Sequence, residues 1–307
     1  MGIEERKELI KSMALESDIS SVLIERCMLL GDIIVSLSMD TYMSQYLAMK
    51  GGAVINFCYL DVPRMSNDID FDFCKSISFK GMEKECQIMT EKLQKISVPF
   101  YNIVAFNRIN KGCSCSFEYR YLNIKGYEDS VFLDINFLKR MHILEYDNIT
   151  IQNKYIKHAV IKSLNITEVM AGKIKLLLER KHAKDFFDVY NIIKSGVIID
   201  KVLLRKCIIF YNVVSGRCDI DCIDIELIDI DRASIDVLLQ MLSVTGTFDF
   251  LSMTETVIEF LCEVLIIEKD ERCFIDNYRN HIYSPAQLFD DYHTVKKIKN
   301  HPMALFV

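Results

Sequence analysis

Hydrophobic residues recur at two different spacings along the chain, and the balance between them changes near its middle. Before about residue 160, apolar runs with helical character alternate with runs typical of β-strands. After that point the pattern is mostly helical. Helices are predicted at residues 22–37, 53–59 and 82–96, strands at residues 68–72 and onward to residue 138, and further helices at residues 167–194, 235–244 and 253–267.

This pattern predicts an α+β protein with two lobes. Residues 1–160 would form a lobe with a mixed sheet, and residues 161–307 a mainly helical lobe that closes one wall of an active-site cleft. Half of the 307 residues are hydrophobic, which is enough to bury one large core or two smaller ones.

Composition and apolar run length indicate the compartment in which the protein works. No apolar run reaches the roughly 18 residues of a membrane span, and the N-terminus is too charged for a secretory signal. Eleven cysteines without paired Cys-x-x-Cys spacing suit buried thiols in a reducing compartment. Cys218 and Cys222 come nearest to zinc spacing, but no histidine is close in sequence, so structural zinc is not expected. We expect a cytoplasmic protein without membrane contact.

The net charge of −6 is unusual for a protein that depends mainly on electrostatic binding of nucleic acid. Any RNA contact would therefore be local. A hairpin is predicted to turn at residues 110–112. Its basic residues Lys111, Arg120 and Lys125 could form a patch with Arg108. An ordinary sheet with a hydrated polar face explains the same residues, and we favour that interpretation.

Two carboxylates alternate on the strand predicted at residues 68–72. Asp68 and Asp70 would share one face about 6.6 Å apart, with Ile69 and Phe71 packed behind them. Side-by-side carboxylates repel, and divalent cations relieve that repulsion. Two bound Mg²⁺ ions can brace the attacking and leaving oxygens of an in-line displacement. The pair suits phosphoryl or nucleotidyl transfer, although Asp-x-Asp alone is common.

A glycine pair precedes these carboxylates. Gly51 and Gly52 have no Cβ atoms, so a turn built from them lets backbone N–H groups approach a phosphate closely. The helix predicted at residues 53–59 would begin there. A Gly-Gly pair alone is usually just a turn, and it is the ordered combination with the acidic strand that favours a phosphate site.

A third carboxylate is expected on a neighbouring strand. Asp134 lies within the apolar, β-rich run of residues 131–138. A charged side chain in such a run is costly to bury unless it is paired or bound to a metal. The residues alone equally allow a strand on which Asp134 faces water.

The helix predicted at residues 167–194 carries a polar stripe. At about 100° per residue, Lys173, Arg180 and Lys184 fall within about 40° of one another, and Asp188 lies close beside them. Such a stripe on an apolar helix favours a cleft over bulk water, with a solvated face as the alternative.

Together these segments resemble the signature of the AbiEii/MenT-type nucleotidyltransferase toxins, within the polymerase-β-like superfamily. A Lys-Gly-Gly turn, an Arg-x-Ser-x-Asp-x-Asp run and a helix with lysine, Arg/Lys-Asp and a further aspartate carry the resemblance. The matching residues are Lys50, Gly51, Gly52, Arg64, Ser66, Asp68, Asp70, Lys173, Arg180, Lys184, Asp185 and Asp188. Lys184 stands where the family more often has arginine.

The resemblance implies a metal-dependent enzyme that transfers NMP from an NTP to a hydroxyl group and uses Mg²⁺ or Mn²⁺. Asp68, Asp70 and Asp134 would bind metal and act in catalysis together with Lys173. The remaining matched residues would bind nucleotide, namely Lys50, Gly51, Gly52, Arg64, Ser66, Arg180, Lys184, Asp185 and Asp188.

The resemblance also implies that the acceptor is the 3′ end of tRNA. The protein would then be the toxin of an AbiE-like pair, partnered by a cognate AbiEi-like antitoxin. Two alternatives stay open: nucleotidylation of a small molecule such as an antibiotic, or of a protein, and a binding module that kept the fold and lost the reaction.

Overall fold

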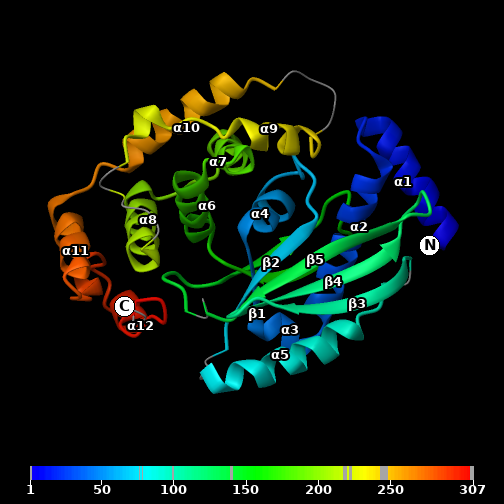
Figure 1. Ribbon diagram of the computed structural model, residues 1–307, viewed down its shortest axis with the longest axis horizontal. Coiled ribbons are helices and arrows are strands. Elements are labelled where there is room, and N and C mark those ends of the chain that lie inside the picture. The colour runs from blue at the N-terminus through cyan, green and yellow to red at the C-terminus, as the bar shows by residue number, and fades with distance from the viewer. Residues whose placement is uncertain are drawn as a thin grey trace. The chain divides into compact units, whose positions relative to one another are not determined.

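The computed structural model describes residues 2–75, 77, 79–98, 100–138, 141–216, 220, 223–242 and 248–304 (Figure 1). The chain divides into two compact units, each described by itself below. The sheet unit consists of Met1–Arg140, Asp147–Ser163 and Leu239–Thr247. The helical unit consists of Met141–Tyr146, Leu164–Leu238 and Phe248–Val307.

A mixed sheet, seven-stranded among the described residues, organises the sheet unit in the order β3-β4-β5-β2-β1-β7-β6. β2 is parallel to β5 and β1 is parallel to β7, whereas the other neighbours are antiparallel. The strands are β1 Leu47–Lys50, β2 Asp68–Phe73, β3 Asn102–Asn110, β4 Ser114–Leu122, β5 Glu128–Asn136, β6 Asp147–Ile151 and β7 Ala159–Ser163. The predicted α+β class and mixed sheet are confirmed.

Alternation along the central strands decides which face is buried. On β5, Val131, Leu133 and Ile135 have no solvent exposure, while the residues between them are half-buried. β2 follows the same rule with Ile69 and Phe71. Successive strand side chains point to opposite faces, so the acidic residues of both strands share the face opposite this core.

Six helical segments of the described residues accompany the sheet. They are α1 Ile3–Ser17, α2 Ser21–Met39, α3 Thr41–Tyr46, α4 Gly51–Val54, the π-helix Ile55–Tyr59 and α5 Phe79–Gln94. α2 is almost wholly apolar over its middle turns, and Ile24, Leu29 and Ile33 are completely buried. α5 packs along the sheet, where Tyr119 of β4 donates a hydrogen bond to the Leu93 carbonyl (Figure 1). α4 lies beside β2.

The helical unit contains α6 Ile166–Arg180, α7 Ala183–Ser195, α8 Lys201–Ser215, α9 Arg232–Leu239, α10 Phe250–Val264, α11 Lys269–Arg279 and α12 Tyr292–Ile298 (Figure 1). Short 3₁₀ turns lie at Ile225–Leu227 and Pro285–Gln287. Among the described residues, no helix has both the length and the apolar character that a membrane crossing requires.

Glu168 of α6 is a buried junction of the helical unit. Its carboxylate accepts hydrogen bonds from His142 Nδ1 at 3.0 Å and from the backbone N–H groups of Ile143 and Leu144 at 3.1 and 3.0 Å. The Tyr211 hydroxyl of α8 donates to the same carboxylate. One side chain thus joins α6, α8 and the segment before the sheet unit resumes at Asp147.

The single helix predicted at residues 167–194 is wrong, because α6 and α7 are separate. Lys181 takes the left-handed conformation with φ 55°, its N–H donates to the Leu177 carbonyl, and α7 begins again after His182. A non-glycine residue in this conformation ends a helix as glycine commonly does, but it gives no comparable signal in the sequence.

The cysteines also depart in part from expectation. Cys86 of α5 and Cys115 of β4 form a disulfide, whereas the sequence predicts thiols. Cys27 and Cys207 are buried thiols, as predicted. Burial raises the pKa of Cys27 to about 11 and that of Cys207 well above its usual value, so both are unreactive at neutral pH. Cys218 and Cys222 lie outside the described residues.

Candidate active site

A row of polar side chains crosses four adjacent strands of the sheet. Lys50 on β1 lies opposite Asp70 on β2, Asp70 opposite Asp134 on β5, and Asp134 opposite Ser116 on β4. Residues paired across neighbouring strands share a face, and neighbouring strands lie about 4.7–4.9 Å apart. The register therefore brings the two carboxylates that the sequence singled out on separate strands next to each other.

Asp68 extends this row at the exposed start of β2. Ser66, which is buried, donates a hydrogen bond from its hydroxyl to Asp68 Oδ1 at 2.9 Å. This contact holds the carboxylate in one orientation. Ser66 thus acts on Asp68 in this structure, whereas the resemblance implied a contact with nucleotide.

Gly51 is required by the same geometry. Its φ is +67°, a conformation that residues with a Cβ rarely adopt, and an added Cβ would lie 3.0 Å from Asp70 Oδ2. Gly51 and Gly52 begin α4, which continues into the π-helix. The first N–H groups of a helix have no partners within it and suit an anion. The glycine turn and the carboxylate of Asp70 are therefore immediate neighbours.

Lys50 and Asp72 form a partly buried ion pair beside the row. Lys50 Nζ lies 2.6 Å from Asp72 Oδ1, and Asp72 is 1% exposed. Burial opposes the charged form of Lys50, but the nearby charges of Asp72 and Asp70 outweigh it and raise the pKa of Lys50. Lys50 therefore remains a cation, and in this structure its ammonium group pairs with the carboxylate of Asp72.

The carboxylates fit a divalent cation by donor chemistry. Mg²⁺ and Mn²⁺ prefer carboxylate oxygens, and Asp134 Oδ1 is buried with no hydrogen-bond partner among the described residues. The ammonium group of Lys111 lies 3.6 Å from that oxygen. No group of three or more His, Cys, Asp or Glu side chains in the described part of the chain is already arranged around a metal position.

The second predicted constellation comes together within the helical unit. Asp185 is fully buried, and it accepts two hydrogen bonds from Arg180, from Nε at 2.6 Å and Nη2 at 2.9 Å. Lys173 Nζ lies 3.3 Å from Asp185 Oδ1 and 2.8 Å from Asp188 Oδ2. The two aspartates thus orient the two cations across the break between α6 and α7.

Lys184 and Arg64 complete the predicted set, and their contact with nucleotide stays a prediction. Lys184 is the second residue of α7, so the stripe that linked it to Lys173 and Arg180 on one helix does not exist. Arg64 is 5% exposed and donates to the Met65 carbonyl at 3.3 Å, which makes it part of the interior of the sheet unit.

Sequence reasoning missed a clamp that positions β2. Arg26 of α2 donates to both oxygens of Asp129 on β5, at 2.9 and 2.8 Å, and to Asn67 Oδ1 at 3.1 Å. Asn67 immediately precedes Asp68, so α2 fixes the start of the acidic strand. No local pattern marks Arg26, because its partners are 41 and 103 residues away in sequence.

We expect Arg180→Lys to lower the free energy of unfolding by about 1 kcal/mol, measured by urea denaturation. A lysine ammonium cannot reproduce the two parallel hydrogen bonds to Asp185, and the partial exposure of Arg180 limits the loss. Lys194→Arg, on the exposed end of α7, is the control and should change stability by less than about 0.5 kcal/mol. Equal stability of both variants would contradict the orienting role of Asp185.

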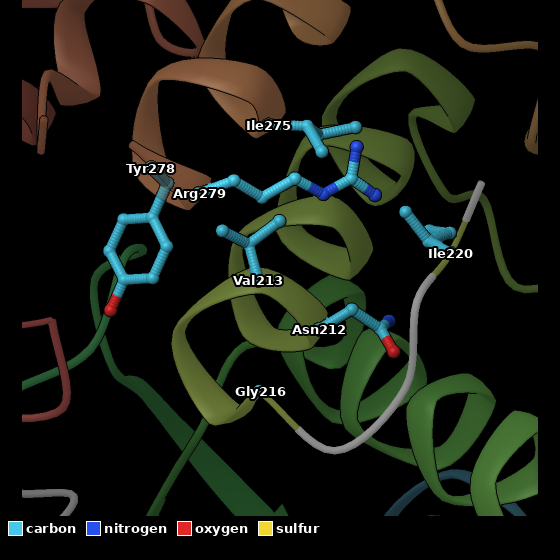
Figure 2. Close-up of a pocket in the computed structure, with 7 residues that line it drawn as sticks. All are labelled: Asn212, Val213, Gly216, Ile220, Ile275, Tyr278 and Arg279. Atoms are coloured by element: carbon cyan, nitrogen blue, oxygen red, sulfur yellow. The ribbon is translucent and has the colours of Figure 1, made fainter. Parts of the chain in front are cut away.

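A pocket of about 200 Å³ lies between α8 and α11 in the helical unit (Figure 2). Asn212, Val213, Gly216, Ile220, Ile275, Tyr278 and Arg279 line it. Asn212 is buried, and its Oδ1 has no hydrogen-bond partner among the described residues. Residues on both sides of Ile220 lie outside the described chain, and we assign the pocket no ligand.

Comparison with known proteins decides the family. Residues 37–255 match the family model described as nucleotidyl transferase AbiEii toxin, type IV toxin–antitoxin system. The chain belongs to the AbiEii nucleotidyltransferase toxin family. The match includes the glycine turn, the acidic strand, β5 and both clusters of polar residues. The suspected resemblance is confirmed, and the protein is accordingly assigned as a nucleotidyltransferase enzyme.

Two solved structures are similar to this chain, and the first of them shares its fold. MenT4, a nucleotidyltransferase toxin from Mycobacterium tuberculosis, is similar over 97% of this chain and 98% of its own, with 15% sequence identity and a TM-score of 0.69. An antigenic nucleotidyltransferase-like protein from Paracoccidioides brasiliensis matches 71% of this chain and 98% of its own, at 17% identity and a TM-score of 0.39. A search of curated protein sequences finds no match. Membership in a type IV toxin–antitoxin family implies an NTP substrate and an antitoxin partner.

Proposed function

We propose that this AbiEii protein is a metal-dependent enzyme that transfers NMP from an NTP to a hydroxyl acceptor and releases pyrophosphate. The observation that carries the proposal is the placement of Asp70 between Asp134 on the neighbouring strand and Gly51 at the start of α4. The carboxylates that could bind a divalent cation therefore lie beside the glycine turn that could bind phosphate.

Each residue of the sheet unit has a proposed task. Asp68, Asp70 and Asp134 would hold Mg²⁺ or Mn²⁺, which when bound neutralises the charge that builds up on the transferring phosphate. Asp134 would also accept the proton of the attacking hydroxyl. Gly51 and Gly52 would present backbone N–H groups to the triphosphate. Ser66 would keep Asp68 oriented toward the site.

In the helical unit, Lys173 and Arg180 would supply positive charge to the triphosphate as pyrophosphate leaves. This part of the proposal rests on the family resemblance and on the orientation that Asp185 and Asp188 give to both cations. Lys184 is proposed as a further nucleotide contact from the family pattern alone.

We propose the 3′ end of tRNA as the acceptor and an AbiEi-like protein as the antitoxin, with both acting in the cytoplasm. The test is the transfer of label from each α-³²P-labelled NTP to total cellular RNA in Mg²⁺ or Mn²⁺. We expect label on RNA of tRNA size with the intact protein only, and none with Asp68→Ala/Asp70→Ala. Label on protein or on a small molecule instead would replace the tRNA proposal.

Growth provides an independent test of the toxin role. Expression of the intact protein should arrest growth, and co-expression of the antitoxin encoded nearby should relieve the arrest. An enzyme that modifies an antibiotic would produce resistance without arrest. A binding module without chemistry would show no NTP turnover with either metal across a broad set of acceptors.

A further inference from the structure

Lys111 is the basic residue of the β3–β4 hairpin that reaches the candidate metal site. It lies in the turn after β3, where its N–H donates to the Ser114 carbonyl at 2.8 Å and Gly112 takes a φ of +66°. Its ammonium nitrogen lies 3.6 Å from Asp134 Oδ1. The turn is thus shaped so that a surface lysine lies over one carboxylate of the row.

Two other basic residues of the hairpin are occupied elsewhere. Arg108 donates two hydrogen bonds to Glu83 of α5, at 2.8 and 3.0 Å. Arg120 pairs with Glu128 across β4 and β5. These pairs support the view that the hairpin is not a general RNA-binding patch. Lys111 differs because its partner belongs to the proposed catalytic row.

The ion pair between Lys111 and Asp134 is weak and easily broken. A separation of 3.6 Å is too long for a hydrogen bond, so the attraction is electrostatic, and Asp134 Oδ1 keeps an unsatisfied acceptor. The Lys111 side chain is 52% exposed and the Asp134 side chain 34%. Exposed ion pairs are weak, and a lysine ammonium on its flexible stem can find a new partner at little cost.

We propose that Lys111 neutralises Asp134 in the unliganded protein, and that it moves to a phosphate group of the substrate when a divalent cation occupies this carboxylate. The inference rests on the proposed function, because it takes Asp134 as a metal ligand. A phosphate oxygen of the NTP and a phosphodiester oxygen of an RNA acceptor offer Lys111 the same charge-assisted hydrogen bond. The test below separates these two sources.

The proposal predicts that Lys111→Ala raises the affinity for Mn²⁺ and lowers the affinity for nucleotide. Without nucleotide, Lys111→Ala should bind Mn²⁺ about two- to fivefold more tightly than the intact protein, because a competing cation is gone. With a non-hydrolysable NTP analogue and saturating Mn²⁺, the same variant should bind the analogue about five- to tenfold more weakly, because a charged hydrogen bond is lost. Mn²⁺ titration followed by electron paramagnetic resonance and equilibrium dialysis of the analogue measure the two quantities.

Matched variants separate the role of Lys111 from general effects of charge. Lys125→Ala removes an exposed lysine from the β4–β5 turn at the other end of β4, and it should leave both affinities within about 1.5-fold. Lys111→Arg keeps the cation and should restore most of the affinity for the analogue. A fall or no change in both affinities for Lys111→Ala would overturn the proposal.

Affinity for the NTP analogue and the KM values for NTP and RNA show which of the two phosphate groups Lys111 binds. If Lys111 binds the NTP, the analogue affinity falls and KM for NTP rises. If it binds the RNA backbone, the analogue affinity is unchanged, KM for RNA rises and Mn²⁺ binding alone still tightens. Absence of transfer by the intact protein would reject the proposed function, whereas the opposite-sign binding result would still decide the role of Lys111.

Discussion

Asp70→Asn should reduce nucleotidyl transfer by about a thousandfold and leave the free energy of unfolding within about 0.5 kcal/mol of the intact protein. Asp70 lies between Asp134 and Lys50 in the cross-strand row, and an amide cannot hold a divalent cation as a carboxylate does. The attraction to Lys50 that is lost is offset by relief of repulsion from the neighbouring carboxylate.

The measurement is NMP transfer under single-turnover conditions, together with urea denaturation of the same preparation. Asp61→Asn is the matched control, because Asp61 is exposed in the loop before β2 and the change removes the same charge. Its activity should stay within about twofold. If Asp70→Asn unfolds, or if it keeps its activity while folded, Asp70 is not the centre of the site.

Glu168→Ala should lower the free energy of unfolding by about 3–5 kcal/mol, the largest loss of stability that we expect from one substitution here. The variant leaves the hydroxyl of Tyr211, a ring nitrogen of His142 and two backbone N–H groups buried without their acceptor. Urea denaturation followed by far-ultraviolet circular dichroism measures the change. Glu263→Ala, on α10 and in an exposed ion pair with Lys201, should cost less than about 1 kcal/mol.

The pKa of Glu168 determines how the stability difference between the intact protein and Glu168→Ala changes with pH. Burial raises the pKa of Glu168, but the charge of His142 and the hydrogen bonds from His142 and Tyr211 outweigh burial and leave the pKa below its usual value. A lowered pKa in the folded state contributes stability above the unfolded pKa, which is lost as the pH falls through the folded one. The stability difference between the intact protein and Glu168→Ala should therefore shrink below about pH 4. A difference that grows on acidification would contradict this assignment.

Local chemistry made part of the site predictable from the sequence. The period of two fixed which residues of β2 and β5 share a face, and the need for a residue without Cβ explains Gly51 beside Asp70. The stripe of Lys173, Arg180 and Lys184 with Asp188 beside it was predicted for a continuous helix that does not exist, and Asp185 entered only through the family resemblance.

Most contacts between distant parts of the chain were not predictable. Asp134 was expected on a strand next to the acidic one, but its register was not. Strand pairing places Asp70 opposite Asp134, and only the completed sheet brings Lys111 to that carboxylate. Arg26 reaches Asn67 through the packing of α2, which no local motif encodes. The break at Lys181 lacks the glycine or proline that commonly announces one.

The parallel pairing of β2 with β5 also bears on when this toxin can first act during its synthesis. Asp70 and Asp134 are 64 residues apart in the chain, and β3 and β4 lie between β2 and β5 in sequence. Pairings of such long range form late, because closing the loop costs entropy before any contact repays it. At about 5–20 residues per second, a ribosome takes several seconds to extend the chain from β2 to the end of β5. Under the proposed function, a growing chain has no complete metal site through that interval, and an antitoxin made at the same time would have those seconds in which to accumulate.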